Sequence, residues 1–278
     1  MENIILNNGV EMPMLGLGVF RVENDNTGAN AVIEAFKHGY RNIDTAAAYE
    51  NEQMVASAIK ESGLKREDVF ITTKLSNTAQ RETDAETAFA ESLKNLATDY
   101  VDLYLIHWPV KEHYIKNWLA LEKIYKSGRA KAIGISNFQA HHIQEIKKVW
   151  TVVPAINQIE LHPRFSQKPL LAACKAEGII PQSWSPLGGS KLWDFKEGLL
   201  TNEVLVKIGE KYNKSTAQVI LRWNIDLGIV TIPKSATPSR IKENADIFDF
   251  KLTDDEIAEI DGLNQDIRIG PDPDNFNF

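Results

Sequence analysis

The chain has 278 residues, with 31 Lys and Arg against 38 Asp and Glu, and its formal net charge of −7 argues against the basic face that nucleic-acid-binding proteins carry. Hydrophobic residues make up 43% and charged residues 25%, which excludes disorder for most of the chain. The single cysteine, Cys174, excludes intrachain disulfides and cysteine-rich metal sites.

No signal peptide is visible at the amino terminus, and no run approaches the ~20 apolar residues of a membrane span. We therefore expect a cytoplasmic protein that binds neither nucleic acid nor a membrane.

The chain opens with a predicted β-hairpin, because Asn8-Gly9 between two apolar stretches favours a turn with positive φ at both central residues. Short apolar segments then alternate with longer amphipathic ones. Eight segments resemble strands: 14–18, 41–44, 69–74, 101–107, 130–135, 156–159, 179–182 and 229–232. Clear helical patterns occupy 29–38, 54–62, 82–96 and 119–126.

Alternating strands and helices predict a parallel sheet, and eight such units close into a (β/α)8 TIM barrel, whose usual size is about 250 residues. The alternative, a doubly wound open sheet, would show G-x-G-x-x-G after its first strand, but Gly16-Leu17-Gly18 lacks the third glycine. A capping box at 253–256 begins a last helix at 256–263. Since no linker interrupts the interior, we expect one domain, 1–278, with the hairpin under the barrel and the Pro- and Asp-rich tail 270–278 over its mouth.

Polar residues stand where the predicted strands end. Asp44 ends the second strand with Tyr49 five residues later, Lys74 ends the third, and His107 ends the fourth. Each has a simpler interpretation alone: a helix N-cap, a packing aromatic, a lysine reaching the rim, a core histidine. Their convergence at the carboxyl ends of barrel strands, where barrel enzymes carry their active sites, favours a functional site.

These four side chains suit proton transfer to a carbonyl oxygen. A tyrosine hydroxyl has a pKa near ~10, and a neighbouring ammonium should lower the pKa of Tyr49 while Asp44 keeps Lys74 charged. His107 can hydrogen-bond the substrate oxygen. The segments His141-His142 and His162-Pro163 lack metal-ligand spacing, so we expect no metal.

Carbonyl reduction also needs a hydride, which no side chain supplies, so the site implies a cofactor. Ser136, Asn137 and Gln158 at later strand ends suit a nicotinamide carboxamide, and Trp184 offers a flat face for its ring. Lys234 and Arg240 stand at the start of a helix, which is either an anion site or a solvated basic turn.

Four stretches, 39–52, 102–109, 134–138 and 232–240 with 243–244, resemble the aldo-keto reductase superfamily, closest to its prokaryotic 2,5-diketo-gluconate reductase-like branch. The resemblance covers essentially the whole chain. It implies that Tyr49 is the general acid, that Asp44 and Lys74 tune it, and that His107 orients the substrate. It also implies a monomer.

The resemblance further implies NADPH as cofactor, with NADH less favoured. The residues that it assigns to the cofactor are Ser136, Asn137 and Gln158 on the carboxamide, Trp184 at a stacking position that is usually Tyr, Ser185, Leu187 and Gly189 along the pyrophosphate, and Lys234, Ser235, Thr237, Arg240, Glu243 and Asn244 around the adenosine and its 2′-phosphate. The substrate pocket would include Val19, Phe20 and Trp108, with the tail ending in Phe276 and Phe278 above them.

We therefore expect an NADPH-dependent reductase of aldehydes and ketones, such as small α-dicarbonyls, aldoses or keto-sugars. One alternative is a lyase that uses Lys74 as a Schiff-base nucleophile, which requires a lowered lysine pKa. The other is a non-catalytic nicotinamide-binding module, as in the similar potassium-channel β-subunits.

Overall fold

The computed structural model describes residues 1–189 and 198–278. Eight parallel strands form one sheet in the order β10-β9-β8-β7-β6-β5-β4-β3. Their bounds are β3 Leu17–Gly18, β4 Asn42–Asp44, β5 Phe70–Leu75, β6 Val101–Ile106, β7 Ala130–Ser136, β8 Ile156–Glu160, β9 Ile180–Trp184 and β10 Val230–Thr231. Bridges from Leu15 to Thr231 and from Gly18 to Lys234 join the first and last strands, so the sheet closes into the predicted barrel.

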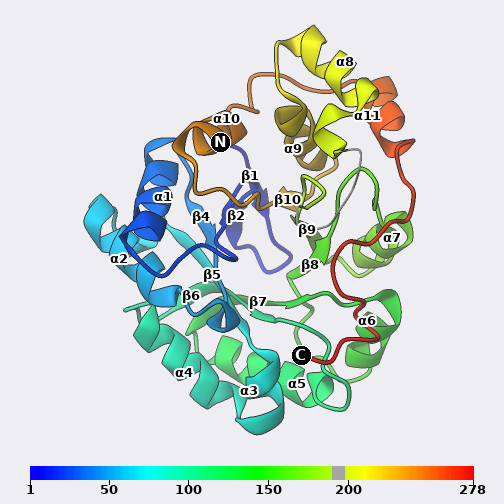
Figure 1. Ribbon diagram of the computed structural model, residues 1–278. Helices are drawn as coiled ribbons and strands as arrows, with labels where there is room; N and C mark the ends of the chain where they lie inside the picture. Colours follow the sequence, from blue (N-terminus) through cyan, green and yellow to red (C-terminus); the bar gives the residue numbers. More distant parts are fainter. Residues whose placement is uncertain (190–197) are drawn as a thin grey trace.

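Helices surround the strands, as Figure 1 shows. Those of the described residues are α1 Asn26–Lys37, α2 Glu52–Ser62, α3 Asn77–Glu82, α4 Ala85–Asn95, α5 Tyr114–Lys126, α6 Ala140–Lys147, α7 Lys168–Ala176, α8 Glu203–Tyr212, α9 Thr216–Asp226, α10 Pro238–Ala245 and α11 Asp254–Asp261. The predicted helix 82–96 is divided, because the Asp84 carboxylate accepts the N–H of Thr87 and begins α4 anew. The capping box at Thr253 is present, and α11 follows it directly.

The central barrel strands show no alternation of buried and exposed residues, because the helices cover their outer face and side chains fill their interior. Every residue of β5 and β6 is buried. On β7, a Cβ at Gly134 would lie 2.7 Å from the carbonyl oxygen of Ile156 and 2.8 Å from Leu105, so the close approach of β8 requires glycine there.

The hairpin, β1 Asn3–Ile5 with β2 Glu11–Pro13, lies under the barrel. The amide of Asn7 donates to the carbonyl of Pro154, and the amide of Asn8 donates to that of Lys131. The predicted turn type is wrong, because only Gly9 has positive φ (86°). The N–H of Gly9 bonds the carbonyl of Leu6, which fits a longer loop in which glycine alone takes the left-handed conformation.

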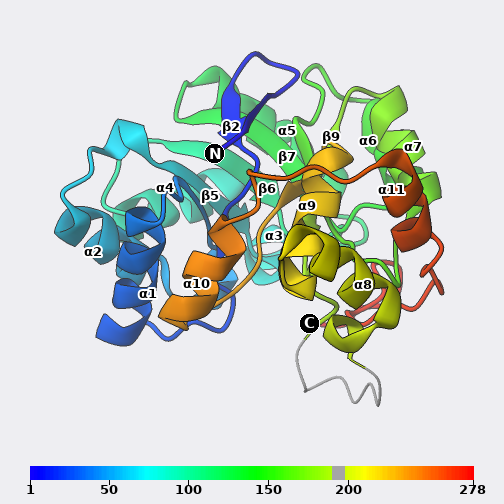
Figure 2. The ribbon, with the colours of Figure 1, turned by 90° about the horizontal axis from the view of Figure 1, so that it is seen from above.

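The carboxyl-terminal tail lies at the other end of the barrel, and Figure 2 shows the hairpin and the carboxyl terminus on opposite sides. The rings of Phe276 and Phe278 pack on Trp108, with centroids 5.2 and 5.4 Å away. The main-chain oxygen of Phe278 accepts hydrogen bonds from Asn77 and Arg81 on α3. The tail therefore covers the mouth as predicted. No helix in the described part of the chain is long and apolar enough to cross a membrane.

Candidate active site

The structure brings the four predicted catalytic side chains together at the mouth. Asp44 is the last residue of β4, Lys74 lies near the end of β5, and His107 follows β6. Tyr49 ends a short 3-10 helix, Ala47–Tyr49, so its hydroxyl reaches back over the strand ends. The Lys74 ammonium lies 3.3 Å from the Tyr49 hydroxyl oxygen, and the Tyr49 ring meets that of His107 edge-on at 5.5 Å.

Lys74 is fully buried and its charge is compensated locally. Its ammonium donates to Oδ1 of Asp44 at 2.5 Å and to the carbonyl of Thr45 at 2.9 Å. Burial acts to lower the pKa of Lys74, but the negative charge of Asp44 and the hydrogen bonds to Asp44 and Tyr49 outweigh it and raise that pKa above its ordinary value. A lysine held as an ammonium is a poor Schiff-base nucleophile, which counts against the lyase alternative.

The pKa of Tyr49 corrects one expectation. Burial raises the pKa of its hydroxyl, and although Lys74 acts to lower it, the net direction is upward. The expected lowering is therefore wrong in sign, because burial of the ring outweighs the nearby ammonium. Tyr49 consequently keeps its proton at neutral pH.

His107 is a neutral imidazole. Burial and the charge of Lys74 hold its pKa well below the usual value. Within residues 1–189 and 198–278, no hydrogen bond engages either ring nitrogen, so the N–H is available to an oxygen placed beside Tyr49.

The predicted carboxamide site is one hydrogen-bonded network across the ends of β7, β8 and β9. Asn137, in the left-handed conformation that asparagine tolerates, donates to the carbonyl of His107 at 3.0 Å and to the Ser136 hydroxyl at 3.1 Å. Trp184 Nε1 donates to Oδ1 of Asn137 at 2.8 Å. These bonds fix the indole and both polar side chains before any ligand arrives.

Gln158 leaves one acceptor open in this network. Its Nε2 donates to Oδ2 of Asp44 at 2.6 Å and to Oε1 of Gln182 at 2.9 Å. No described residue hydrogen-bonds its Oε1. This oxygen is not among the fully buried atoms of the described residues, so it is accessible, and the amide group of a nicotinamide carboxamide would supply a donor to it.

The predicted phosphate end lies at the start of α10. Lys234 and Arg240 are exposed and form no ion pair with another described residue. Thr237 precedes α10 without a side-chain cap, so the first N–H groups of the helix remain open. Two cations beside an open helix N-terminus fit an anionic group.

The remaining predicted cofactor residues differ in whether their polar groups already have hydrogen-bond partners within the protein. Ser185 (φ 49°) and Gly189 (φ 84°) both take the left-handed conformation, and Leu187 packs partly against the core. The Ser235 hydroxyl is already bonded to the Thr237 backbone, the Glu243 carboxylate already accepts the Ser215 hydroxyl, and the buried Asn244 has no side-chain partner among the described residues. One carboxylate oxygen of Glu243 is thus already occupied by a hydrogen bond within the protein.

An aromatic rim surrounds Tyr49. Phe20 is 53% exposed with its ring 5.0 Å from that of Tyr49, and Trp108 is covered by the tail. Val19, also assigned to the pocket, is fully buried in the hydrophobic core, so the structure does not expose it at the mouth.

Sequence reasoning missed Asn51. Its amide donates to the carbonyls of Val19 and Val22 and accepts the Thr45 hydroxyl, which ties the loop before Tyr49 to the first barrel strand. A polar residue two positions after the candidate acid was the available signal.

Among the residues that the structure describes, one side-chain cluster resembles a metal site. Ligand atoms of His141, His142 and Asp274 lie within 4.8 Å of one another, although no spacing rule predicted it. However, Nδ1 of His142 accepts the N–H of Gln139, so its Nε2 carries the proton and donates to Asp274. A histidine ligand presents a bare nitrogen to the metal, so this cluster fits a clamp on the tail instead.

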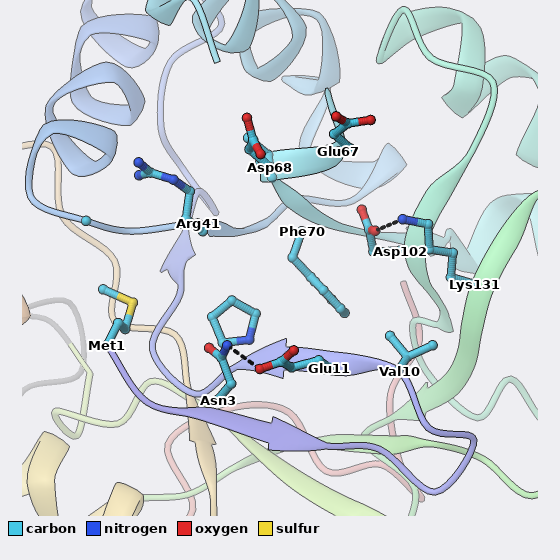
Figure 3. Close-up of a pocket in the computed structure, with 13 residues that line it drawn as sticks. Met1, Asn3, Val10, Glu11, Arg41, Glu67, Asp68, Phe70, Asp102 and Lys131 are labelled. Atoms are coloured by element: carbon cyan, nitrogen blue, oxygen red, sulfur yellow. Dashed lines mark hydrogen bonds and ion pairs between the residues drawn. The ribbon is translucent and has the colours of Figure 1, made fainter. Parts of the chain in front are cut away.

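A cavity of about 500 Å³ lies at the base of the barrel, between the hairpin and the starts of the strands (Figure 3). Two polar contacts lie in its lining: an ion pair between Lys131 and Asp102 at 3.0 Å, and a hydrogen bond from Asn3 to Glu11 at 2.7 Å. It lies at the opposite end from the strand-end residues above, where barrel enzymes place structural rather than catalytic groups.

Fold and site together define a barrel protein with an enzyme-like site, because its polar residues converge at the carboxyl ends of the strands. Residues 14–265 match the Aldo/keto reductase family, and the chain belongs to that family.

The chain is 53% identical over 277 residues to the glyoxal reductase of Bacillus subtilis (strain 168), with 100% of this chain and 98% of the relative covered. It is 46% identical to the methylglyoxal reductase DkgA of Escherichia coli (strain K12), with 98% and 97% covered. Among solved structures, an aldo-keto reductase from a Medee basin deep-sea metagenome library superposes with a TM-score of 0.92 at 41% identity, covering 99% of this chain and 100% of that one. A Bombyx mori aldo-keto reductase in complex with NADP gives 0.89 at 35% identity, covering 98% and 96%.

Proposed function

We propose that residues 1–278 form a single-domain, NADPH-dependent reductase of small aldehydes and ketones, with Tyr49 as the general acid. The observation that carries this proposal is the position of the Lys74 ammonium, 2.5 Å from Asp44 and 3.3 Å from the Tyr49 hydroxyl. The names of the Bacillus and Escherichia relatives support small α-dicarbonyls as the first substrates to try.

The side chains divide the proton chemistry between them. Tyr49 holds its proton at neutral pH and gives it to the carbonyl oxygen as that oxygen becomes an alkoxide. Lys74 stabilises the phenolate left behind, and Asp44 keeps Lys74 charged. The neutral His107 donates its ring N–H to the same substrate oxygen and sets its direction.

When bound, the nicotinamide supplies the hydride to the carbonyl carbon. The open Oε1 of Gln158, together with Ser136 and Asn137, would hold the carboxamide, and Trp184 would cover one face of the ring. Lys234 and Arg240 would hold the 2′-phosphate, which favours NADPH over NADH. The solved NADP complex of the Bombyx mori relative supports a nicotinamide cofactor.

The test is NADPH oxidation, followed by absorbance, with glyoxal, methylglyoxal, an aldose and a keto-sugar. We expect turnover on the α-dicarbonyls. Binding of NADPH without turnover on any of the four would replace this proposal by the non-catalytic module. A borohydride-trapped adduct on Lys74 would replace it by the lyase.

A further inference from the structure

Glu160 is a buried carboxylate at the barrel mouth, and it has no role in the proposed proton transfer. It is the last residue of β8 and lies opposite Trp184, the last residue of β9. Its Oε1 accepts the N–H of Ile269 at 2.7 Å, and its Oε2 accepts the N–H of Gly270 at 2.8 Å. One carboxylate thus holds two consecutive N–H groups at the start of the tail, and such charge-assisted bonds are strong when buried.

These two bonds place Gly270 against the indole of Trp184. A Cβ at Gly270 would lie 2.3 Å from Cη2 and 3.2 Å from Cζ3 of that ring. The φ of Gly270 is not positive, so glycine is needed there for space and not for backbone conformation. The tail backbone at Gly270 therefore packs directly against the outer edge of the indole.

The opposite edge of the indole is also held, since Nε1 of Trp184 donates to Asn137, and Asn137 donates to the carbonyl of His107. With both edges held, the ring has one available plane. His162 adds a third contact to Glu160, with Nε2 3.1 Å from Oε1, which restricts the carboxylate in turn.

We propose that Glu160 is a positioning residue that, through Gly270, fixes the plane of the Trp184 indole on which the nicotinamide is to lie. This inference rests on the proposed function, in which Trp184 covers the cofactor ring. This role would connect the carboxyl-terminal tail to cofactor binding, in addition to the position of the tail over the barrel mouth.

The first experiment compares Glu160→Gln with Glu122→Gln. Glu122 is a matched control, because it is also buried and also accepts two consecutive N–H groups, those of Thr151 and Val152, but on the outer helix α5. An amide has one acceptor oxygen, so Glu160→Gln loses one of its two N–H bonds, which lie on different oxygens. Glu122→Gln instead loses the acceptor of the Thr151 hydroxyl, because both N–H groups bond Oε1 of Glu122. We expect Glu160→Gln to raise the Kd for NADPH, measured by calorimetry, about fivefold or more, as loss of one charge-assisted bond implies. Glu122→Gln should lower the thermal midpoint and leave that Kd within about twofold, since it acts on stability alone.

The second experiment is a double-mutant cycle. Gly270→Ala should weaken NADPH binding about tenfold, the cost of forcing a methyl group into a packed contact. In a Trp184→Phe background, Cη2 and Cζ3 are gone, so the same change should cost at least about threefold less. Some loss should remain, because the methyl group would also lie 2.9 Å from Oε2 of Glu160.

The outcomes separate this inference from the proposed function. If the unmodified protein binds no NADPH, both the proposed function and the positioning role of Glu160 are wrong. If it binds NADPH but Glu160→Gln and Glu122→Gln shift Kd equally, or Gly270→Ala costs the same in both backgrounds, the positioning role alone is overturned.

Discussion

The ammonium nitrogen of Lys74 lies 3.3 Å from the hydroxyl oxygen of Tyr49, and no part of the Lys74 side chain is exposed. A buried cation next to a protonated phenol is stable only because Asp44 and the carbonyl of Thr45 compensate it. The Lys74 ammonium therefore lies beside the Tyr49 hydroxyl before the reaction and stabilises the negative phenolate that forms when Tyr49 gives up its proton.

Tyr49→Phe should remove the acid and leave the cofactor site intact. We expect kcat to fall at least ~100-fold, the usual contribution of general acid catalysis, while the Kd for NADPH stays within about twofold. Tyr125→Phe, on α5 away from the mouth, is the control and should keep normal activity. A Tyr49→Phe enzyme with undiminished kcat would show that the proton comes from another group.

The pH profile follows from two pKa shifts of opposite direction. Tyr49 must be protonated to act, and because burial raises its pKa, activity should fall only above its ordinary value near ~10. His107 must be neutral, and because burial lowers its pKa, activity should fall only well below ~6.5. Measured kcat/KM for methylglyoxal should be flat between these limits. A limb with a midpoint near neutral pH would contradict the assignment of both groups.

Lys234→Ala combined with Arg240→Ala should discriminate between the two nicotinamide cofactors. Both side chains are exposed beside the open N-terminus of α10, so their loss should raise the Kd for NADPH about tenfold or more and that for NADH less than about threefold. Lys242→Ala, later on the same helix, controls for the change in charge. Equal losses for both cofactors would remove the 2′-phosphate assignment.

Gly134→Ala tests the packing of the barrel itself. The added methyl group would lie 2.7 Å from a β8 carbonyl oxygen, so we expect the free energy of unfolding in urea to fall by about 1–3 kcal/mol. Gly198→Ala is the control, because its nearest neighbour is 3.8 Å away and its φ is not positive. Equal stability of the two variants would mean that β7 and β8 can separate without cost.

The sequence predicted the strands and helix caps that depend on neighbouring residues in the chain. The apolar runs 69–74 and 101–107 correspond to β5 and β6, since strands covered on both faces need no alternation. The capping box at Thr253 lies where the sequence places it, because its hydrogen bonds join residues three apart. The hairpin turn type was wrong, since residues around Asn8 are held by distant carbonyls that no local pattern shows.

Taken by itself, the sequence determined the barrel and the strand ends at which Asp44, Lys74 and His107 stand, because short apolar runs and their alternation with helical patterns are local properties of the chain. Only the tertiary structure decided the protonation of the site. Whether the pKa of Tyr49 ends above or below its ordinary value depends on the balance between its burial and the charge of Lys74, and burial is set by distant segments packing together. The same holds for Glu160: its carboxylate binds N–H groups of Ile269 and Gly270, more than a hundred residues further along the chain.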